Sequence, residues 1–302
     1  MARGLADIGA EGVLLAGAGR AILLQVADPR IGHGVAAHSN FVDRPQDRLV
    51  ATLTYVYAIV YGTDSQVAAV RRAVNRAHVP VHKPADGSSA GYNAFDASSQ
   101  LWVVATLYDT AVTVYQHVLG SPDDHTADRM YRDYARIGTA LQLPPEMWPA
   151  DRAAFAEYWN RQVASLQPDE AARKIARDLL YPSRGPVLMR PLMPLARLLT
   201  VGMLPEHVRE GFGLEWNPAH ARRFQRTMRL LGQVYPRLPR RIRHWPKNYC
   251  LGQAATTARP VPGQDPECVV RRRWKRPSTA SPTATWTGWF RAAGREAFGK
   301  RG

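Results

Sequence analysis

Arg48, Thr52 and His78 are the residues of this sequence whose types and spacing suggest a cofactor pocket. Arg48 and Thr52 are four residues apart in the run 48–61, which is apolar on nearly every side. This pattern predicts a fully buried helix with the guanidinium and the hydroxyl on one face. Because a buried arginine needs a partner, the pair indicates a pocket rather than ordinary core.

His78 is predicted to lie at the inner end of the next helix. That helix begins with a capping-box pattern at Thr63–Gln66 and is ended by Pro80, which disfavours helical geometry in the residue before it. Its apolar stripe runs into His78 at helical spacing and consists of Val67, Val70 and Val74. By itself, such a histidine has a simpler explanation in the helix dipole. Together with Arg48 and Thr52, it indicates a site between two helices.

The remaining helices predict an all-α fold. A third apolar helix over 101–115, with Asp96 as its N-cap, contains Trp102 and Thr106. Another begins at 121–124, with Ser121 as the cap, and reaches about Leu141. Further helices are predicted at 151–166, 169–180, 192–202, 206–211 and 219–235. No alternating strand pattern or Asn-Gly turn appears, so we expect one multi-helix globular domain over residues 1–250.

The glycine-rich stretch 12–27 is not typical of a nucleotide-binding loop. Gly17 and Gly19 lack a third glycine in register, and no strand and crossover pattern follows. We predict a buried helix over about 20–27, with the glycines allowing another backbone to approach. The stretch is too short and too broken for a signal peptide or a membrane span, so a cytoplasmic protein is expected.

Metal sites of the common kinds have little support. Only two cysteines are present, too few for a disulfide framework or a cysteine-based zinc or iron–sulfur site. His33 and His38 are five residues apart and would point about 140° away from each other on a helix. They are therefore expected to be structural histidines.

The C-terminal residues 251–302 are predicted to be a disordered basic tail rich in Pro, Ser, Thr and Arg. They hold ten basic and three acidic residues, so seven of the fifteen units of net positive charge come from this segment. Its centre is the basic block 271–276 around Trp274. Cations and aromatic rings of this kind are typical of segments that contact anionic membranes or nucleic acid, and we favour the membrane over nucleic acid. A solvated tail without a partner is the simpler interpretation.

Seven motifs give the chain a resemblance to a known family. They occupy residues 19–29, 34–41, 48–53, 74–78, 92–96, 101–107 and 204–209. In order and spacing they resemble the b-type haem oxygenases that include the bacterial rubber oxygenase, or latex clearing protein, and the fungal oxygenase of mycophenolic acid biosynthesis. The resemblance covers about residues 10–245.

The resemblance implies specific roles for the pocket residues. His78 would be the proximal ligand of the haem iron, and Arg48 and Thr52 would lie on the distal side. Trp102 and Thr106 are assigned to cofactor binding with them. Ala51 stands where the rubber oxygenases have a distal lysine, so the sixth coordination position should be empty or hold water. Asp28 and Val104 stand where the family often has histidine.

The resulting hypothesis is a haem b oxygenase that uses dioxygen or peroxide to oxidise an apolar substrate, isoprenoid or lipid-like. Arg48 and Thr52 would then be its catalytic residues. A haem carrier or sensor without turnover is one alternative. Another is a membrane- or nucleic-acid-binding module in which the basic tail is the functional part.

Overall fold

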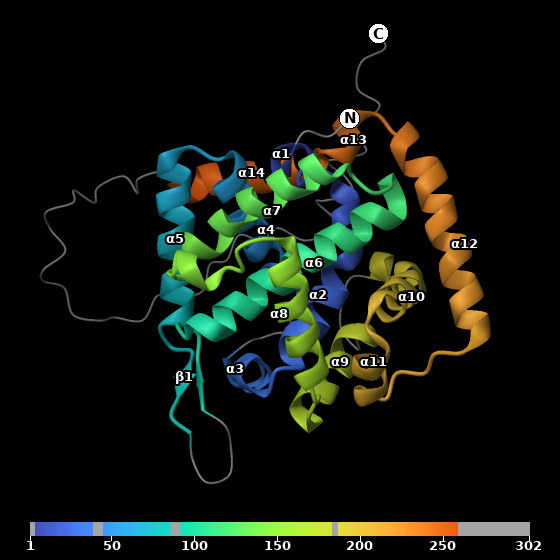
Figure 1. The fold of residues 1–302 in the computed structure, drawn as a ribbon, viewed down its shortest axis with the longest axis horizontal. Coiled ribbons are helices and arrows are strands. Elements are labelled where there is room, and N and C mark those ends of the chain that lie inside the picture. The colour runs from blue at the N-terminus through green and yellow to red at the C-terminus, as the bar shows by residue number, and fades with distance from the viewer. Residues whose placement is uncertain (1–3, 39–44, 86–90, 183–186, 259–302) are drawn as a thin grey trace, which may run out of the picture.

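The computed structural model describes residues 4–38, 45–85, 91–182 and 187–258, and these form the all-α body that the sequence predicts (Figure 1). The N-terminal half contains α1 (Leu5–Ile8), η1 (Gly12–Gly17), α2 (Ala18–Val26), α3 (Pro29–His38), α4 (Pro45–Tyr61), α5 (Asp64–His78), α6 (Ala97–Leu119) and α7 (Asp124–Thr139). The only described strands are the two-residue pair β1 (His82–Lys83) and β2 (Tyr92–Asn93), which are antiparallel with His82 opposite Asn93.

The C-terminal half is also helical. It contains η2 (Pro145–Met147), α8 (Arg152–Ser165), α9 (Glu170–Leu180), η3 (Val187–Leu192), α10 (Met193–Met203), α11 (Glu206–Gly211), α12 (Pro218–Val234), η4 (Tyr235–Arg237), α13 (Arg240–Arg243) and α14 (Trp245–Ala258). Helix α14 packs along α4 and α5, so the helical body continues to Ala258 instead of stopping at the expected boundary of 250. The rest of the predicted tail lies outside the described residues.

Local signals in the sequence set most helix starts. Thr63 accepts from the Gln66 backbone N–H, and the Gln66 side chain accepts from the Thr63 N–H, so the predicted capping box is confirmed. Asp96 caps α6 as predicted. The cap of α7 was wrongly predicted at Ser121, because Asp123 accepts from the Thr126 N–H and the helix begins after it.

Helix α6 crosses the middle of the molecule and organises the core (Figure 1). It packs against η1, α2, α7 and α12. Gly17 lies directly against Thr110 of α6, and Gly19 against Thr200 of α10, with no room for a side chain. The two glycines permit a close approach, but the neighbouring atoms are threonine side chains and not the backbone that was predicted. Next to Gly19, buried Arg20 pairs with Asp109 at 2.6 Å and donates to the Met203 carbonyl at 2.8 Å, which joins α2, α6 and α10.

The hydrophobic core has two parts. The larger one surrounds α2, α4 and the first half of α6, and the smaller one joins η1, the end of α6, α10 and α12 through residues such as Val114, Met203 and Phe224. No helix among the described residues is both long and apolar enough to cross a bilayer.

Candidate functional site

A cavity of about 890 Å³ lies inside the larger core. Its walls come mainly from α2, α3, α4, α5 and α6, and α1, η1, β2, α7 and α14 contribute further residues. Known ligand pockets have volumes of about 300–1,000 Å³ and are mostly apolar with a few polar groups. This cavity has the size and the mixed lining of such a pocket.

Helix α4 forms one wall of the cavity, which corrects the prediction that the helix is buried all round. Arg48 and Ala51 are exposed and Thr52 is half-buried, whereas Tyr55 and Ala58 further along the helix are buried. All three of the less buried residues line the cavity, so their open surface faces an internal space. Burial lowers the pKa of the Arg48 guanidinium, because many protein atoms surround it and disfavour its charged form.

His78 lines the same cavity from the last turn of α5, where the sequence predicted it. Its neighbours on the valine stripe, Val70 and Val74, also line the cavity. The Nδ1 atom is buried and has no hydrogen-bond partner among the described residues, while the ring lies edge-on to Phe95 at 6.1 Å. Burial, and then the positive charge of Arg48, lower the pKa of His78. A lowered pKa favours the neutral imidazole, which is the form that binds metals.

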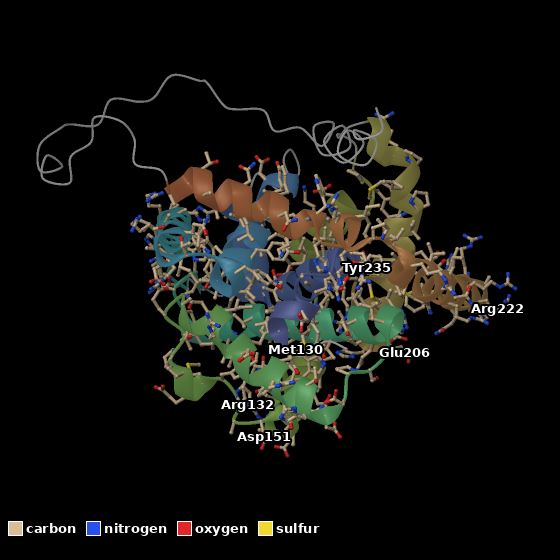
Figure 2. All side chains as sticks on the ribbon, turned by 90° about the horizontal axis from the view of Figure 1, so that it is seen from above. Met130, Arg132, Asp151, Glu206, Arg222 and Tyr235 are labelled. Atoms are coloured by element: carbon tan, nitrogen blue, oxygen red, sulfur yellow. The ribbon has the colours of Figure 1, made fainter. Side chains whose placement is uncertain are left out.

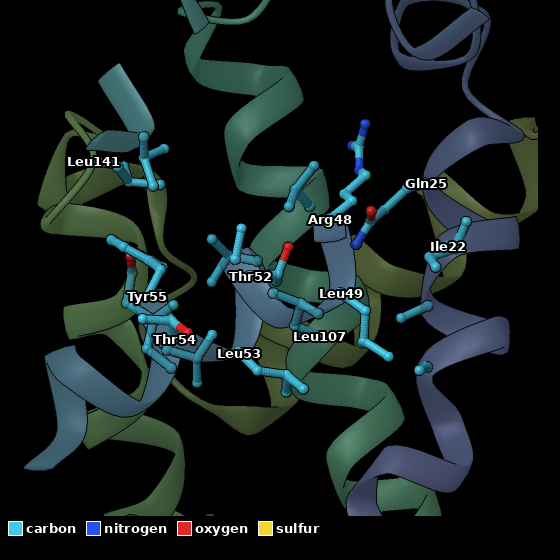
Figure 3. A pocket seen from close by; sticks show the side chains of 18 of the residues that line it. Ile22, Gln25, Arg48, Leu49, Thr52, Leu53, Thr54, Tyr55, Leu107 and Leu141 are labelled. Atoms are coloured by element: carbon cyan, nitrogen blue, oxygen red, sulfur yellow. The ribbon is translucent and has the colours of Figure 1, made fainter. Parts of the chain in front are cut away.

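A polar residue that sequence reasoning missed lines the cavity together with Arg48 and Thr52. Figure 3 shows the Gln25 side chain reaching from α2 toward α4, where Arg48 and Thr52 lie; the Arg48 guanidinium points away from Thr52, and Leu49, Leu53 and Leu107 lie lower in this view. Gln25 comes from α2 and donates to the Thr106 hydroxyl at 3.0 Å. The cavity lining therefore combines these polar side chains with aliphatic ones such as Ile22 and Leu107.

Trp102 and Thr106, expected to bind the cofactor, are not on the cavity wall. Trp102 is buried on another face of α6, where its indole N–H donates to the Leu24 carbonyl at 3.0 Å and its ring lies 5.2 Å from that of Trp159. Thr106 is fully buried behind Gln25. The structure does not bring either side chain to the pocket. Thr106 accepts a hydrogen bond from the side-chain amide of Gln25, and it is Gln25 that lines the pocket.

Gln100 is the second residue that the sequence did not single out. It lies on the first turn of α6, is buried and lines the cavity. Its Nε2 donates to the Ala94 carbonyl at 3.1 Å, and its Oε1 has no partner among the described residues. Gln25 lies within an apolar stretch, whereas Gln100 follows Ser98 and Ser99 at the start of an apolar run, so the sequence offers a signal only for Gln25.

The other histidines occupy different environments. His33 pairs with Asp169 at 2.7 Å and is not part of the large cavity. His82 is exposed and contacts the Val79 carbonyl, and His117 packs against Phe224. His38 lines the cavity and lies 2.9 Å from the Tyr92 hydroxyl. Among the described histidines, His38 and His78 are therefore the two that line this pocket.

Among the described residues, no group of three or more His, Cys, Asp or Glu side chains could hold a bare metal ion. A haem iron needs no such group, because the porphyrin supplies four nitrogens and the protein adds one or two axial ligands. The fold and the cavity thus define a class: an all-α protein with a mostly apolar pocket that has a histidine, an arginine and a threonine at its wall.

Comparison with known proteins identifies the family. Residues 6–233 match the family described as ER-bound oxygenase mpaB/B'/Rubber oxygenase, catalytic domain, and the chain belongs to this family. The uncharacterized proteins Rv2237 of Mycobacterium tuberculosis and Mb2261 of Mycobacterium bovis are each 37% identical over 223 residues, which is 71% of this chain and 87% of theirs. No solved structure matches the chain. The resemblance found in the sequence motifs is thereby confirmed at the level of the family and its oxygenase domain.

Proposed function

We propose that this protein is a haem b oxygenase that oxidises an apolar, isoprenoid or lipid-like substrate inside the cavity. Membership of an oxygenase family supports the reaction class. The observation that favours haem is the buried Nδ1 of His78, a polar atom that has no hydrogen-bond partner in the described part of the chain and lies beside a cavity of cofactor size. Burying a polar atom without a partner is costly, and such atoms often mark functional sites.

Each cavity residue has a role in this proposal. His78 holds the iron through a ring nitrogen, and the bound haem supplies the centre at which dioxygen or peroxide is activated. Arg48 places a positive charge at the wall of the cavity, which suits a propionate carboxylate or the oxygen substrate. Thr52 adds a hydroxyl beside it. The aliphatic lining residues, among them Ile22, Leu53 and Leu107, bind the apolar substrate by removing its surface from water.

Haem content tests the proposal directly. The purified protein should show a Soret absorption band, and His78→Ala should abolish or greatly weaken it while far-ultraviolet circular dichroism still reports a helical fold. His33→Ala, His82→Ala and His117→Ala are the controls, because none of these side chains lines the cavity. Each should keep most of the haem.

Two results would overturn the assignment. Full haem retention in His78→Ala is one, and haem loss only in His38→Ala is the other, since His38 is the second histidine at the cavity. Turnover is tested separately by oxygen consumption with an isoprenoid or an unsaturated lipid. A haem-loaded protein that consumes no oxygen with any such substrate would argue for a carrier or sensor instead.

A further inference from the structure

The outer face of α12 is strongly basic and lies far from the cavity helices α4 and α5 (Figure 1). The helix buries Phe224 and Met228 against the smaller core. On the other side, Arg222, Arg226 and Arg229 follow at intervals of four and three residues and are all exposed. This spacing places them along one stripe of the helix surface. Figure 2 shows Arg222 at the outer edge of the molecule.

The positive charge of this region is not balanced by acidic residues. The sequence from Asn217 to Ala258 contains no Asp or Glu and nine basic residues: Arg222, Arg223, Arg226, Arg229, Arg237, Arg240, Arg241, Arg243 and Lys247. Arg243 points inward and pairs with Glu11. Within the described part of the chain, no carboxylate lies at ion-pair distance from Arg222, Arg226 or Arg229. Their charges are therefore available to an external anion.

Exposed aliphatic side chains lie beside these arginines. Leu230 and Val234 are one turn apart on α12 and are 60% and 49% exposed, and Ile242 on the following α13 is 51% exposed. Arg226, Leu230 and Val234 continue one another at four-residue spacing, so the basic and aliphatic stripes adjoin. We call the exposed set Arg222, Arg226, Arg229, Leu230 and Val234 the α12 face.

We propose that the α12 face docks the protein on an anionic lipid surface. A helix with cations beside exposed aliphatic residues is typical of segments that lie in the membrane interface, where headgroups attract the cations and the aliphatic chains enter the acyl boundary. Nucleic acid fits less well, because its single strands need aromatic stacking platforms and the exposed large apolar residues of this face are aliphatic. The inference does not depend on haem or on the proposed reaction.

Vesicle flotation with the full chain tests the proposal. The probes are vesicles of phosphatidylcholine alone and of phosphatidylcholine with phosphatidylglycerol, each over a series of salt concentrations. The parent protein should bind only the anionic vesicles, and less as salt rises. Arg222→Glu/Arg226→Glu should weaken binding by more than about 25-fold, since each arginine near an anionic surface contributes roughly fivefold.

A matched control comes from α5 on the opposite side of the molecule (Figure 1). Arg72→Glu/Arg76→Glu makes the same charge change at the same four-residue spacing, and both side chains are exposed. This control should bind anionic vesicles as the parent does. Leu230→Ser/Val234→Ser keeps every charge and should also weaken binding, because aliphatic insertion is lost. Circular dichroism of each variant verifies that it is folded.

Several outcomes would overturn the proposal. They are no binding of the parent to anionic vesicles, unchanged binding after the α12 reversal, or an equal loss in the α5 control, which would show an effect of net charge alone. Binding to duplex DNA that is stronger than vesicle binding at the same salt, and lost in the α12 reversal, would identify a nucleic acid partner instead.

Discussion

The two sides of α6 both carry apolar side chains but face different surroundings. On one side Tyr108 is enclosed by rings, with centroid distances of 4.9 Å to Phe155 and 5.2 Å to Tyr134. On the other side the adjacent Leu107 is only half-buried and lines the cavity. Helices α7 and α8 fill the first space with aromatic side chains, whereas α4 and α5 leave the second open. An apolar helix face therefore predicts burial but does not distinguish core from ligand pocket.

The largest effect on stability is expected in the cluster of aromatic rings around Tyr108. Tyr108→Ala should lower the free energy of unfolding by about 3–5 kcal/mol, as for other large aromatic residues truncated in a core, because the surrounding rings cannot collapse into the space. Guanidinium denaturation measures this change. A loss below about 1 kcal/mol would mean that the ring cluster is loosely packed and the contrast with the cavity side is false.

Trp102→Phe separates a structural role from a cofactor role for this residue. The substitution leaves the Leu24 carbonyl near the end of α2 without its donor, which should cost about 1–3 kcal/mol. The haem content of the purified variant should match that of the parent, because Trp102 does not line the cavity. Haem loss from a variant that is still folded would support the cofactor-binding role that the resemblance implies for Trp102.

Leu107→Ala tests the cavity side at a position next to Tyr108 in the sequence. Buried leucines truncated to alanine cost about 2–5 kcal/mol, and Leu107 should cost less than about 2 kcal/mol because part of its surface already faces open space. Binding of an apolar fluorescent probe should change in this variant and stay unchanged in Tyr108→Phe. A stability loss as large as that of Tyr108→Ala would indicate that the cavity is closed in solution.

The smallest expected effect is a change in the pKa of His78 when the positive charge of Arg48 is removed. The positive charge of Arg48 is one of the two causes that lower the pKa of His78, so Arg48→Met should raise this pKa toward its ordinary value of 6.5. Histidine titration by NMR in haem-free protein measures the shift, and Arg72→Met serves as the exposed control. An unchanged pKa in Arg48→Met would show that the two side chains are not coupled.

The same coupling has a defined sign in stability. Because the pKa of His78 is lower in the folded chain, the unfolded chain binds the proton first as the pH falls through 6.5. The contribution of His78 to stability is therefore lost on acidification and retained at higher pH. This decrease should be smaller in Arg48→Met.

Local signals in the sequence determined much of the fold and part of the site. The capping box at Thr63 and the break before Pro80 set the bounds of α5, and they place His78 in its last turn. The four-residue spacing of Arg48 and Thr52 gives them one face of α4. These features depend only on hydrogen bonds and helical periodicity within a short segment, so they can be read before the fold is known.

Only the tertiary structure decided which of these faces meets open space. Periodicity groups the residues of a helix into faces, but the neighbour of each face is set by packing between segments distant in sequence. Trp102 and Thr106 therefore do not line the cavity. Gln25, which comes from a helix earlier in the chain, lines the same cavity as Arg48 and Thr52. Residues of α14 close the cavity from the other end of the chain, and no local pattern could have predicted that contact.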